Sequence, residues 1–329
     1  MSVENYKKAL FDSIMNLLWR QWVALGVAGY SRESEKQYTL DPESLIIFSA
    51  AFCRQDARLF DLFASWLLKY GRLINTTRLK SLLSKAAYCD TRTLAYLAAL
   101  NVEGGDKRWS RFAVSEKFEE DEGRVLFVAE NGDEYNYCRA QDELALRYGL
   151  YRPTFVVQNK LRRELPADHP TLLLRLRSLF GVSARAEVLM LLMQGAANIQ
   201  QLSEQSGFVR SAVKEVLDEL LMGNMVSTVK VSGGRVAYVL RNADGLMSLM
   251  GVEKVIVPDW KNIYEALGKI WKLVSNPRLL GLSEATFTGE LMHLFRAEIQ
   301  PFLLHCGVRN LENLSETALE DLPRIISEM

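Results

Sequence analysis

Hydrophobic residues recur at helical spacing over most of the chain, and residues that favour helix N-caps stand where each run begins. The first 100 residues predict an all-helical unit. The expected helices cover residues 4–28, 42–53, 57–70, 76–85 and 91–100, with Asp41, Asp56, Asn75 or Thr76, and Asp90 as caps. Residues 259–329 return to this pattern. One apolar stripe there contains Trp260, Ile263, Leu267, Ile270, Trp271 and Val274.

The chain changes character after residue 100. The β-prone residues 124–129 and 134–138 flank Asn131 and Gly132, a dipeptide that favours a tight turn between two strands. The sequence therefore predicts a β-hairpin within a mixed segment. Residues 103–143 also carry twelve acidic and six basic side chains, which is typical of a solvated loop.

The pattern from residue 183 to residue 240 is the most informative in the chain. It predicts helices over residues 183–193, 199–205 and 209–222, and then strands over residues 226–231 and 236–240. Asn198 is expected to cap the second helix. Gly207 is expected to supply the positive φ of a tight corner before the third helix. Gly223 and Asn224 both tolerate the left-handed conformation that ends a helix.

This order resembles the winged helix-turn-helix of bacterial and archaeal transcription regulators of the ArsR and MarR type, over residues 178–240 only. The residues that carry the resemblance are Leu179 and Phe180, 183–189, 202–207, 211–213, Leu217, Leu220 and 224–226. Two features depart from the family. The metal-sensing cysteines are absent, because no cysteine lies between residues 139 and 305, and Val209 stands where the third helix usually has a Ser or Thr cap.

The resemblance implies that the third helix lies in the major groove of DNA and that the hairpin touches the DNA backbone. The positions expected to face outward on the third helix are Arg210, Ser211, Lys214, Glu215 and Asp218. Arg210 is interpreted as a partner of guanine, and Ser211 and Lys214 as contacts to bases or phosphates. Lys230 and Arg235 in the wing are interpreted as contacts to phosphates or the minor groove. The alternative is that these residues are ordinary solvated charges.

Three further arginines lie near the start of this module. Arg175 and Arg177 stand among leucines on a helix expected just before it, and Arg185 occupies an arginine position of the ArsR pattern. They are interpreted either as contacts to DNA phosphates or as partners of the acidic residues 103–143.

Composition narrows the classes of function. The 329 residues are 49% hydrophobic and hold forty basic and forty acidic side chains. No global charge therefore draws the chain to nucleic acid, and the argument depends on local charge. Four scattered cysteines without a C-x-x-C pair argue against a disulfide framework and favour a reducing cytoplasm. We expect no signal peptide and no membrane span.

The sequence does not predict an enzyme. His169, His293 and His305 lack metal-ligand spacing, and neither a nucleophile elbow nor a Walker A sequence is present. Cys306 adjoins His305, but neighbouring helical residues point about 100° apart, which makes them poor catalytic partners. We therefore predict no catalytic residue, no metal and no cofactor.

The predicted fold is mainly α, in four parts. These are a helical N-terminal domain (1–100), a mixed segment with a β-hairpin (101–170), an α+β winged helix-turn-helix domain (171–245) and a helical tail (246–329). The predicted function is a cytoplasmic, sequence-specific regulator of transcription that binds double-stranded DNA as a homodimer, because half-sites are normally read by two copies. The candidate dimer-interface residues are Trp260, Trp271, Leu291, Phe295 and Phe302. Residues 1–150 are left for an unknown effector or protein partner.

Two alternatives remain open. The first is a winged-helix module that binds protein, such as an adaptor or a neutralising partner of a neighbouring gene product. The second, more remote, is an enzyme in residues 1–150.

Overall fold

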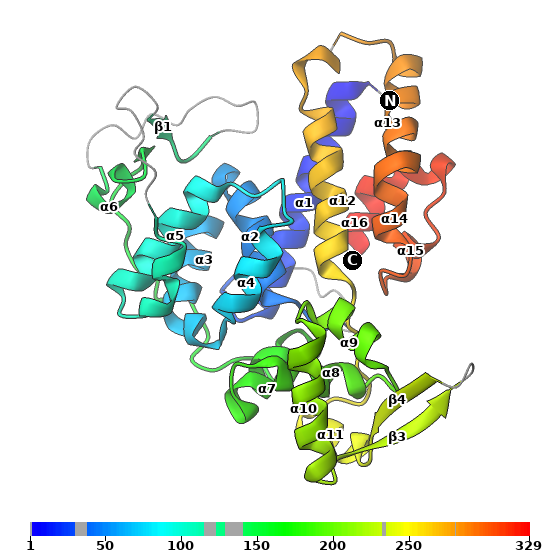
Figure 1. Ribbon diagram of the computed structural model, residues 1–329. Helices are drawn as coiled ribbons and strands as arrows, with labels where there is room; N and C mark the ends of the chain where they lie inside the picture. The colour runs from blue at the N-terminus through cyan, green and yellow to red at the C-terminus, as the bar shows by residue number, and fades with distance from the viewer. Residues whose placement is uncertain (1, 30–37, 115–122, 129–140, 232–234, 280) are drawn as a thin grey trace.

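A computed structural model describes residues 2–29, 38–114, 123–128, 141–231, 235–279 and 281–329 (Figure 1). The described chain is mainly helical and has two small sheets. The α-helices are α1 (Val3–Ala24), α2 (Pro42–Phe52), α3 (Ala57–Tyr70), α4 (Thr76–Leu83), α5 (Thr91–Glu103), α6 (Glu143–Leu146), α7 (Leu172–Phe180), α8 (Ala184–Leu192), α9 (Ile199–Ser206), α10 (Arg210–Met222), α11 (Ala243–Leu249), α12 (Trp260–Val274), α13 (Glu284–Leu294), α14 (Gln300–Leu303), α15 (Arg309–Glu312) and α16 (Leu322–Glu328). The strands are β1 (Arg124–Val125), β2 (Leu150–Tyr151), β3 (Val226–Val231) and β4 (Arg235–Leu240).

The helices of the first 100 residues begin where their caps predict. Asp41, Asp56, Asn75 and Asp90 each accept hydrogen bonds from backbone N–H groups in the first turn of α2, α3, α4 and α5. The end of the first helix differs from the expectation. It lies at Ala24 rather than at residue 28.

The larger hydrophobic core combines helices from both ends of the chain. Helix α1 packs along α12 and α16, and α12 also packs against α2 (Figure 1). Two buried indole N–H groups find acceptors in this core. Trp22 donates to Ser49 Oγ (2.9 Å), and Trp260 donates to the Thr39 carbonyl (2.8 Å). We call α1–α5 and α12–α16 the helical body. The predicted C-terminal tail is thus part of the same core as the N-terminal helices.

The residues predicted to form a dimer interface lie mostly inside this core. The exposed fractions of Trp260, Leu291 and Phe295 are 2%, 3% and 1%, and Trp271 and Phe302 are half-buried. The apolar residues of α12 and α13 are covered by other helices of the same chain. The apolar positions of this region are therefore buried without a second copy of the chain. Their number does not support a dimer interface at these residues, which corrects the expectation from the sequence.

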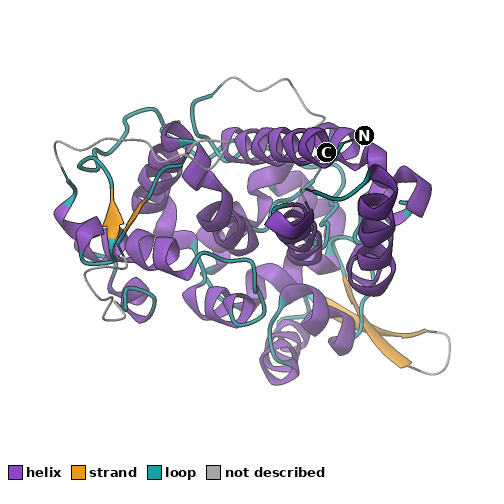
Figure 2. Ribbon diagram, turned by 90° about the horizontal axis from the view of Figure 1, so that it is seen from above, coloured by secondary structure: helices purple, strands orange, loops and turns teal. Residues whose placement is uncertain are grey.

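A second, smaller core joins α7–α11 with β3 and β4, and we call this part the helix–hairpin unit. Strands β3 and β4 are antiparallel, from the pair Val226–Leu240 to the pair Val231–Arg235. The unit lies at one end of the molecule, and its hairpin projects away from the helical body (Figures 1 and 2).

The region of the predicted central hairpin is only partly described. Residues 129–140, which include the turn and the second arm, lie outside the described residues. The described start of the first arm is β1, which pairs in parallel with β2, a pairing that the sequence pattern does not predict. In the described part of the chain, no helix combines the length and the apolar character needed to cross a lipid bilayer.

Candidate nucleic-acid interface

Helices α9 and α10 meet at a sharp corner. Asn198 and Gln201 form a reciprocal capping box at the start of α9, and Gly207 ends this helix at φ 78°, in the left-handed region. The Ser203 hydroxyl donates to the Phe208 carbonyl (2.6 Å) and fixes the turn from its inner side. Both capping positions match the sequence prediction. After α10, the left-handed residue is Asn224 (φ 56°).

The hairpin is joined by a third extended segment. Between α8 and α9, Ala197 pairs with Tyr238 of β4. The Ala197 N–H donates to the Tyr238 carbonyl (3.0 Å), and the Tyr238 N–H donates to the Ala197 carbonyl (2.8 Å). The order from α8 is thus helix, short extended segment, helix, corner, helix and two-stranded ribbon.

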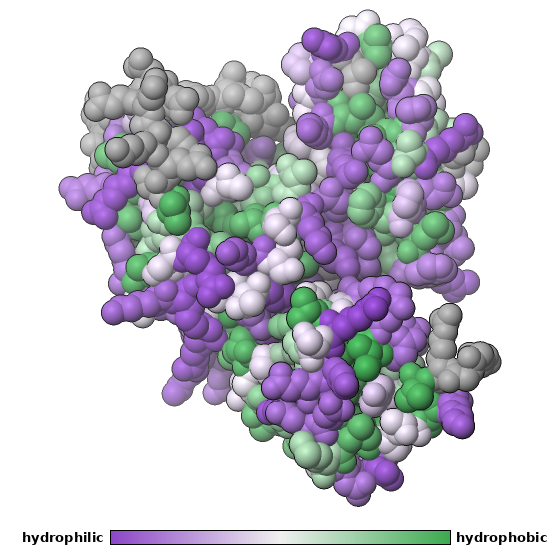
Figure 3. Space-filling model, viewed as in Figure 1, coloured by the Kyte–Doolittle hydropathy of each residue, from purple (hydrophilic) through white to green (hydrophobic). Residues whose placement is uncertain are grey.

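The outward face of α10 carries the side chains that the sequence places there. Arg210, Ser211 and Lys214 are exposed, and so are Glu215 and Asp218. The basic residues occupy the first turn and a half of the helix and the acidic residues follow them. This hydrophilic face is visible on the helix–hairpin unit in Figure 3, with apolar side chains around it.

The hairpin contributes one described basic side chain. Lys230 is exposed on β3. Arg235 is the first residue of β4, but its side chain and residues 232–234 lie outside the described residues.

Arg185 does not stand alone on the surface. Its guanidinium forms an ion pair with Glu219 of α10, and the side chains are 40% and 44% exposed. Its charge is therefore balanced within the unit. No local pattern in the sequence marks this pair, because the two residues are 34 positions apart.

The structure contradicts the interpretation of Arg177 as a DNA contact and gives Arg175 backbone carbonyls as partners. Arg175 donates to the carbonyls of Met250 (2.6 Å) and Asp168 (3.1 Å). Arg177 is 1% exposed and pairs with carboxylates on α2 and α8. Arg177 is thus withdrawn from any DNA surface, and its described partners do not belong to the acidic residues 103–143.

These partners form a buried ionic network between the helical body and the helix–hairpin unit. Its members, which we call the interface network, are Asp41 and Glu43 at the start of α2, Arg78 of α4, Arg177 of α7 and Glu187 of α8. Glu43 is shared. Its Oε1 accepts from Arg177 Nη1 (2.6 Å) and its Oε2 from Arg78 Nη1 (2.7 Å).

The charges of the interface network shift its pKa values. Burial acts to raise the pKa of Asp41, but the paired Arg78 guanidinium outweighs burial, and the pKa falls to about 2. Glu187 differs, because burial raises its pKa and the nearby guanidiniums of Arg177 and Arg78 only partly offset this. Its Oε2 atom is also buried without a hydrogen-bond partner among the described residues.

The interface network also holds the corner between α9 and α10. Arg78 Nε donates to the Ser206 carbonyl at the end of α9 (2.6 Å). A side chain at Gly207 would begin 3.6 Å from the same Nε atom. Lys261 of α12 also donates to α9, at the Glu204 carbonyl (3.0 Å). Residues of the helical body thus contact the end of α9 and the corner from which α10 begins.

The helical pattern of the sequence contains a signal that two charged residues of the interface network, Arg177 and Glu187, are buried. Arg177 lies four residues after Leu173 and three before Phe180, and Glu187 lies three after Ala184 and four before Leu191. Each charge thus sits on an apolar stripe of its helix, where a charged side chain normally requires a buried partner. The identity of the partners depends on contacts between distant segments.

Nothing in the described part of the chain assembles a metal site from His, Cys, Asp or Glu. Cys306 is buried and its thiol faces the Val308 carbonyl (Sγ to O, 3.6 Å), whereas His305 is exposed. Burial raises the pKa of Cys306 to about 11, so this thiol is protonated at neutral pH. Comparisons of the chain with family models, with curated proteins and with solved structures found no match.

Proposed function

We propose that the chain is a sequence-specific regulator of transcription that binds double-stranded DNA through the helix–hairpin unit, which we interpret as a winged helix-turn-helix. One observation carries the proposal. A tight corner presents a helix whose first turns expose Arg210, Ser211 and Lys214, and a two-stranded antiparallel hairpin, to which Ala197 adds a single bridge, follows in the order expected for a wing. In this interpretation α10 is the recognition helix and the β3–β4 hairpin is the wing.

The chemistry of the exposed face fits a DNA groove at one end of α10. A guanidinium on the first turn can form two hydrogen bonds with a guanine, and Lys214 lies one turn further along the same face. Lys230 on β3 is suited to a backbone phosphate. Glu215 and Asp218 lie beyond the basic residues, and in the complex they must face away from the phosphates.

Binding to DNA predicts a strong dependence on salt. Each phosphate neutralised by a lysine or arginine releases condensed counterions, so the affinity for random duplex should fall steeply as salt rises. A titration followed by fluorescence anisotropy across a series of salt concentrations measures this slope. A flat response, or no binding at low salt, would contradict the proposal.

Two substitutions separate base reading from backbone contact. Arg210→Ala is expected to cost about 1–3 kcal/mol on a selected operator and to relax the preference at one base pair. Lys230→Ala is expected to weaken binding to all duplexes alike and to lower the salt slope by about 0.9. Arg309→Ala, an exposed arginine on α15 of the helical body, is the matched control. If both wing and helix variants bind as the parent does, α10 does not lie in a groove.

A protein partner is the second candidate function, and specific features of α10 favour it. The exposed fractions of Val209 and Met222, at the two ends of the helix, are 68% and 81%. Between them Glu215 and Asp218 add negative charge to the same outward face. Exposed apolar side chains next to charged ones are typical of protein-interaction surfaces. The salt titration separates the candidates, because a protein-binding module would leave random duplex unbound.

The regulator is further proposed to act as a homodimer in the cytoplasm. Two copies match two half-sites of an operator. Cys53, Cys89 and Cys306 are free thiols, which fits a reducing compartment. Because Trp260, Leu291 and Phe295 are buried within the chain, the proposed dimer must use other, exposed residues.

A further inference from the structure

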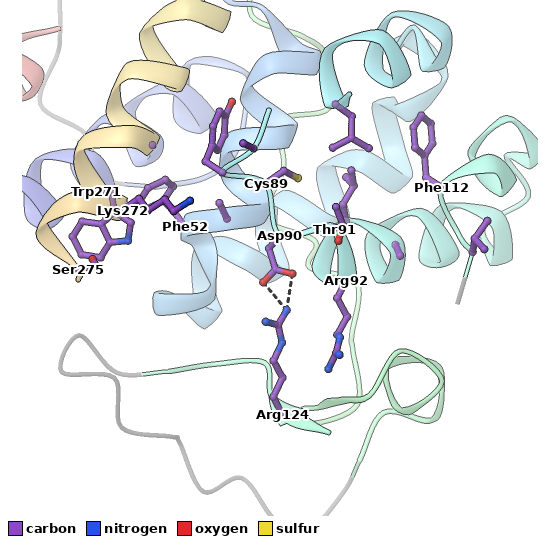
Figure 4. Close-up of a pocket in the computed structure, with 18 of the residues that line it drawn as sticks. Phe52, Cys89, Asp90, Thr91, Arg92, Phe112, Arg124, Trp271, Lys272 and Ser275 are labelled. Carbon is purple, nitrogen blue, oxygen red and sulfur yellow. Dashed lines mark hydrogen bonds and ion pairs between the residues drawn. The ribbon is translucent and has the colours of Figure 1, made fainter. Parts of the chain in front are cut away.

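The helical body contains a groove of about 1050 Å³ that the proposed DNA contacts do not use. The start of α5 lies between its two sides, with Asp90, Thr91 and Arg92 (Figure 4). On one side Trp271, Lys272 and Ser275 project from α12, and on the other Phe112 follows the short 3₁₀ helix Lys107–Arg111. The volume is slightly above the usual range of small-molecule sites, which is roughly 300–1000 Å³.

The described lining of the groove has an excess of positive charge. It contains four basic side chains, Arg92, Arg111, Arg124 and Lys272, and one acidic side chain, Asp90. Asp90 is already engaged, because Arg124 Nη2 lies 2.6 Å from both of its carboxylate oxygens and Arg54 Nη1 lies 3.3 Å from one of them. Burial, followed by the like charge of Arg124, lowers the pKa of Arg54. The guanidiniums near Asp90 are therefore close enough to repel one another, and an anion would relieve that repulsion.

Two further basic side chains of the lining are exposed and can bind such an anion. Arg111, which directly precedes Phe112, and Lys272 of α12 both line the groove and are exposed. These two exposed cations are the groups that an anion in the groove can contact directly.

The floor of the groove is aromatic. Phe52 and Phe112 are 2% and 8% exposed, and Tyr88 and Trp271 are half-buried. The ring of Tyr88 lies directly on α12, because a Cβ atom at Gly268 would approach its Cγ to 2.6 Å. Only glycine at this position allows the ring to lie so close to the helix. Flat apolar rings beside cationic side chains form a surface on which a planar, negatively charged molecule can stack and pair.

We propose that this groove binds a small organic anion with a planar aromatic part, of the nucleoside phosphate class. The phosphates lie toward Arg111, Arg124 and Lys272, and the base lies over Tyr88 and Trp271. This site goes beyond the proposed DNA contacts and does not depend on them. It assigns a ligand to a part of the chain for which the sequence predicts only an unidentified effector or partner.

The test measures ligand binding in the absence of DNA, with the full chain. The probes are the four ribonucleoside triphosphates, inorganic triphosphate and the four nucleosides, titrated by calorimetry and by tryptophan emission. At least one nucleoside triphosphate is expected to bind, and to bind more tightly than either inorganic triphosphate or its nucleoside. Equal binding of inorganic triphosphate would overturn the aromatic part of the proposal. Absence of binding by every nucleotide at millimolar concentration would overturn the whole proposal.

Charge-reversal variants test whether the ligand binds in the groove. Arg111→Glu and Lys272→Glu are each expected to weaken nucleotide binding at least tenfold, and Arg309→Glu, on the exposed surface of α15, is expected to leave it unchanged. Trp271→Phe should retain binding in calorimetry but lose most of the emission change. Thermal melting of each variant establishes that it is folded. If the groove variants bind as tightly as the Arg309 variant, the ligand lies elsewhere and the assignment fails, whatever the result of the DNA titrations.

Discussion

Arg177 offers the sharpest test of how the two parts of the molecule are held together. Its side chain is fully buried and makes four hydrogen bonds. Nη1 donates to Glu43 Oε1 (2.6 Å) and to the Leu73 carbonyl (2.9 Å), and Nη2 donates to Glu43 Oε2 (2.9 Å) and to Glu187 Oε1 (2.6 Å). Replacement of Arg177 by Met keeps much of the length of the side chain but removes the charge and all four donors.

The expected loss of stability follows from the groups left behind. Hydrogen bonds to charged groups contribute about 1.5–3 kcal/mol each, so a simple sum over the three to carboxylates would be about 4.5–9 kcal/mol. This sum is an upper bound. Glu43 keeps Arg78 (2.7 Å) and the Asn75 N–H (2.7 Å) as partners, and Glu187 can take up a proton. Loss of one member of a buried pair typically costs about 3–5 kcal/mol, and we expect Arg177→Met to lie at the lower end, at about 3 kcal/mol.

The assay is unfolding in urea followed by circular dichroism, with Arg185→Met as the matched control. The control makes the same chemical change, but its Arg185–Glu219 pair is 40% and 44% exposed. A pair at such exposure contributes about 0–1 kcal/mol. If Arg177→Met costs less than about 1 kcal/mol, or no more than Arg185→Met, the interface network does not stabilise the contact between the helical body and the helix–hairpin unit.

Three other predictions concern the titration of Glu187, the corner at Gly207 and the assembly of the chain. Burial raises the pKa of Glu187 above its ordinary value of 4.5, so the folded state binds this proton more tightly than the unfolded state, and the free energy of unfolding falls as pH rises from 4.5 toward the raised value. Glu187→Gln cannot titrate, so urea titrations across this window should show its free energy of unfolding rising relative to that of the parent as pH rises. A difference that does not change with pH would contradict the shift. Gly207→Ala should destabilise the chain by about 1 kcal/mol, since its φ of 78° is unfavourable for a residue with a Cβ atom, and thermal melting should record a lower Tm than for the parent. Sedimentation at micromolar concentration should give a mass near twice 37.4 kDa. Substitution of the buried Leu291 by Ala should lower stability without changing the fraction of dimer. A chain that stays monomeric when concentrated would remove the dimer from the proposed function.

The local features of the fold are predictable because their physical causes are local. The caps Asp41, Asp56 and Asn198 act on backbone groups within three residues, and the sequence pattern predicts them correctly. Gly207 adopts its positive φ for the same kind of reason. The exposure of Arg210 follows from helical periodicity alone.

The remaining features depend on segments that are far apart in the chain. Helix α16 packs against α1, so the predicted tail joins the N-terminal core. Strand β1 pairs in parallel with β2, which no local turn signal marks. Arg177 and Glu43 are 134 positions apart, and their pairing determines whether Arg177 lies on a basic surface or in a core. Periodicity predicts which face of a helix is buried, but it does not predict which element buries it.

This distinction bears directly on the candidate site. The sequence predicts the side chains that α10 presents, but it does not predict that the corner before α10 is held by Arg78, which reaches Ser206 across 128 positions of the chain. Arg78 belongs to α4, and the residues that follow this helix, including Tyr88 and Asp90, line the groove of the helical body. The same short segment therefore contacts both the corner before α10 and the proposed ligand site. A ligand in the groove can change the orientation of α10 through this segment only if it binds two arrangements of the segment with different free energies, because a shift in an equilibrium requires such a difference between its two states.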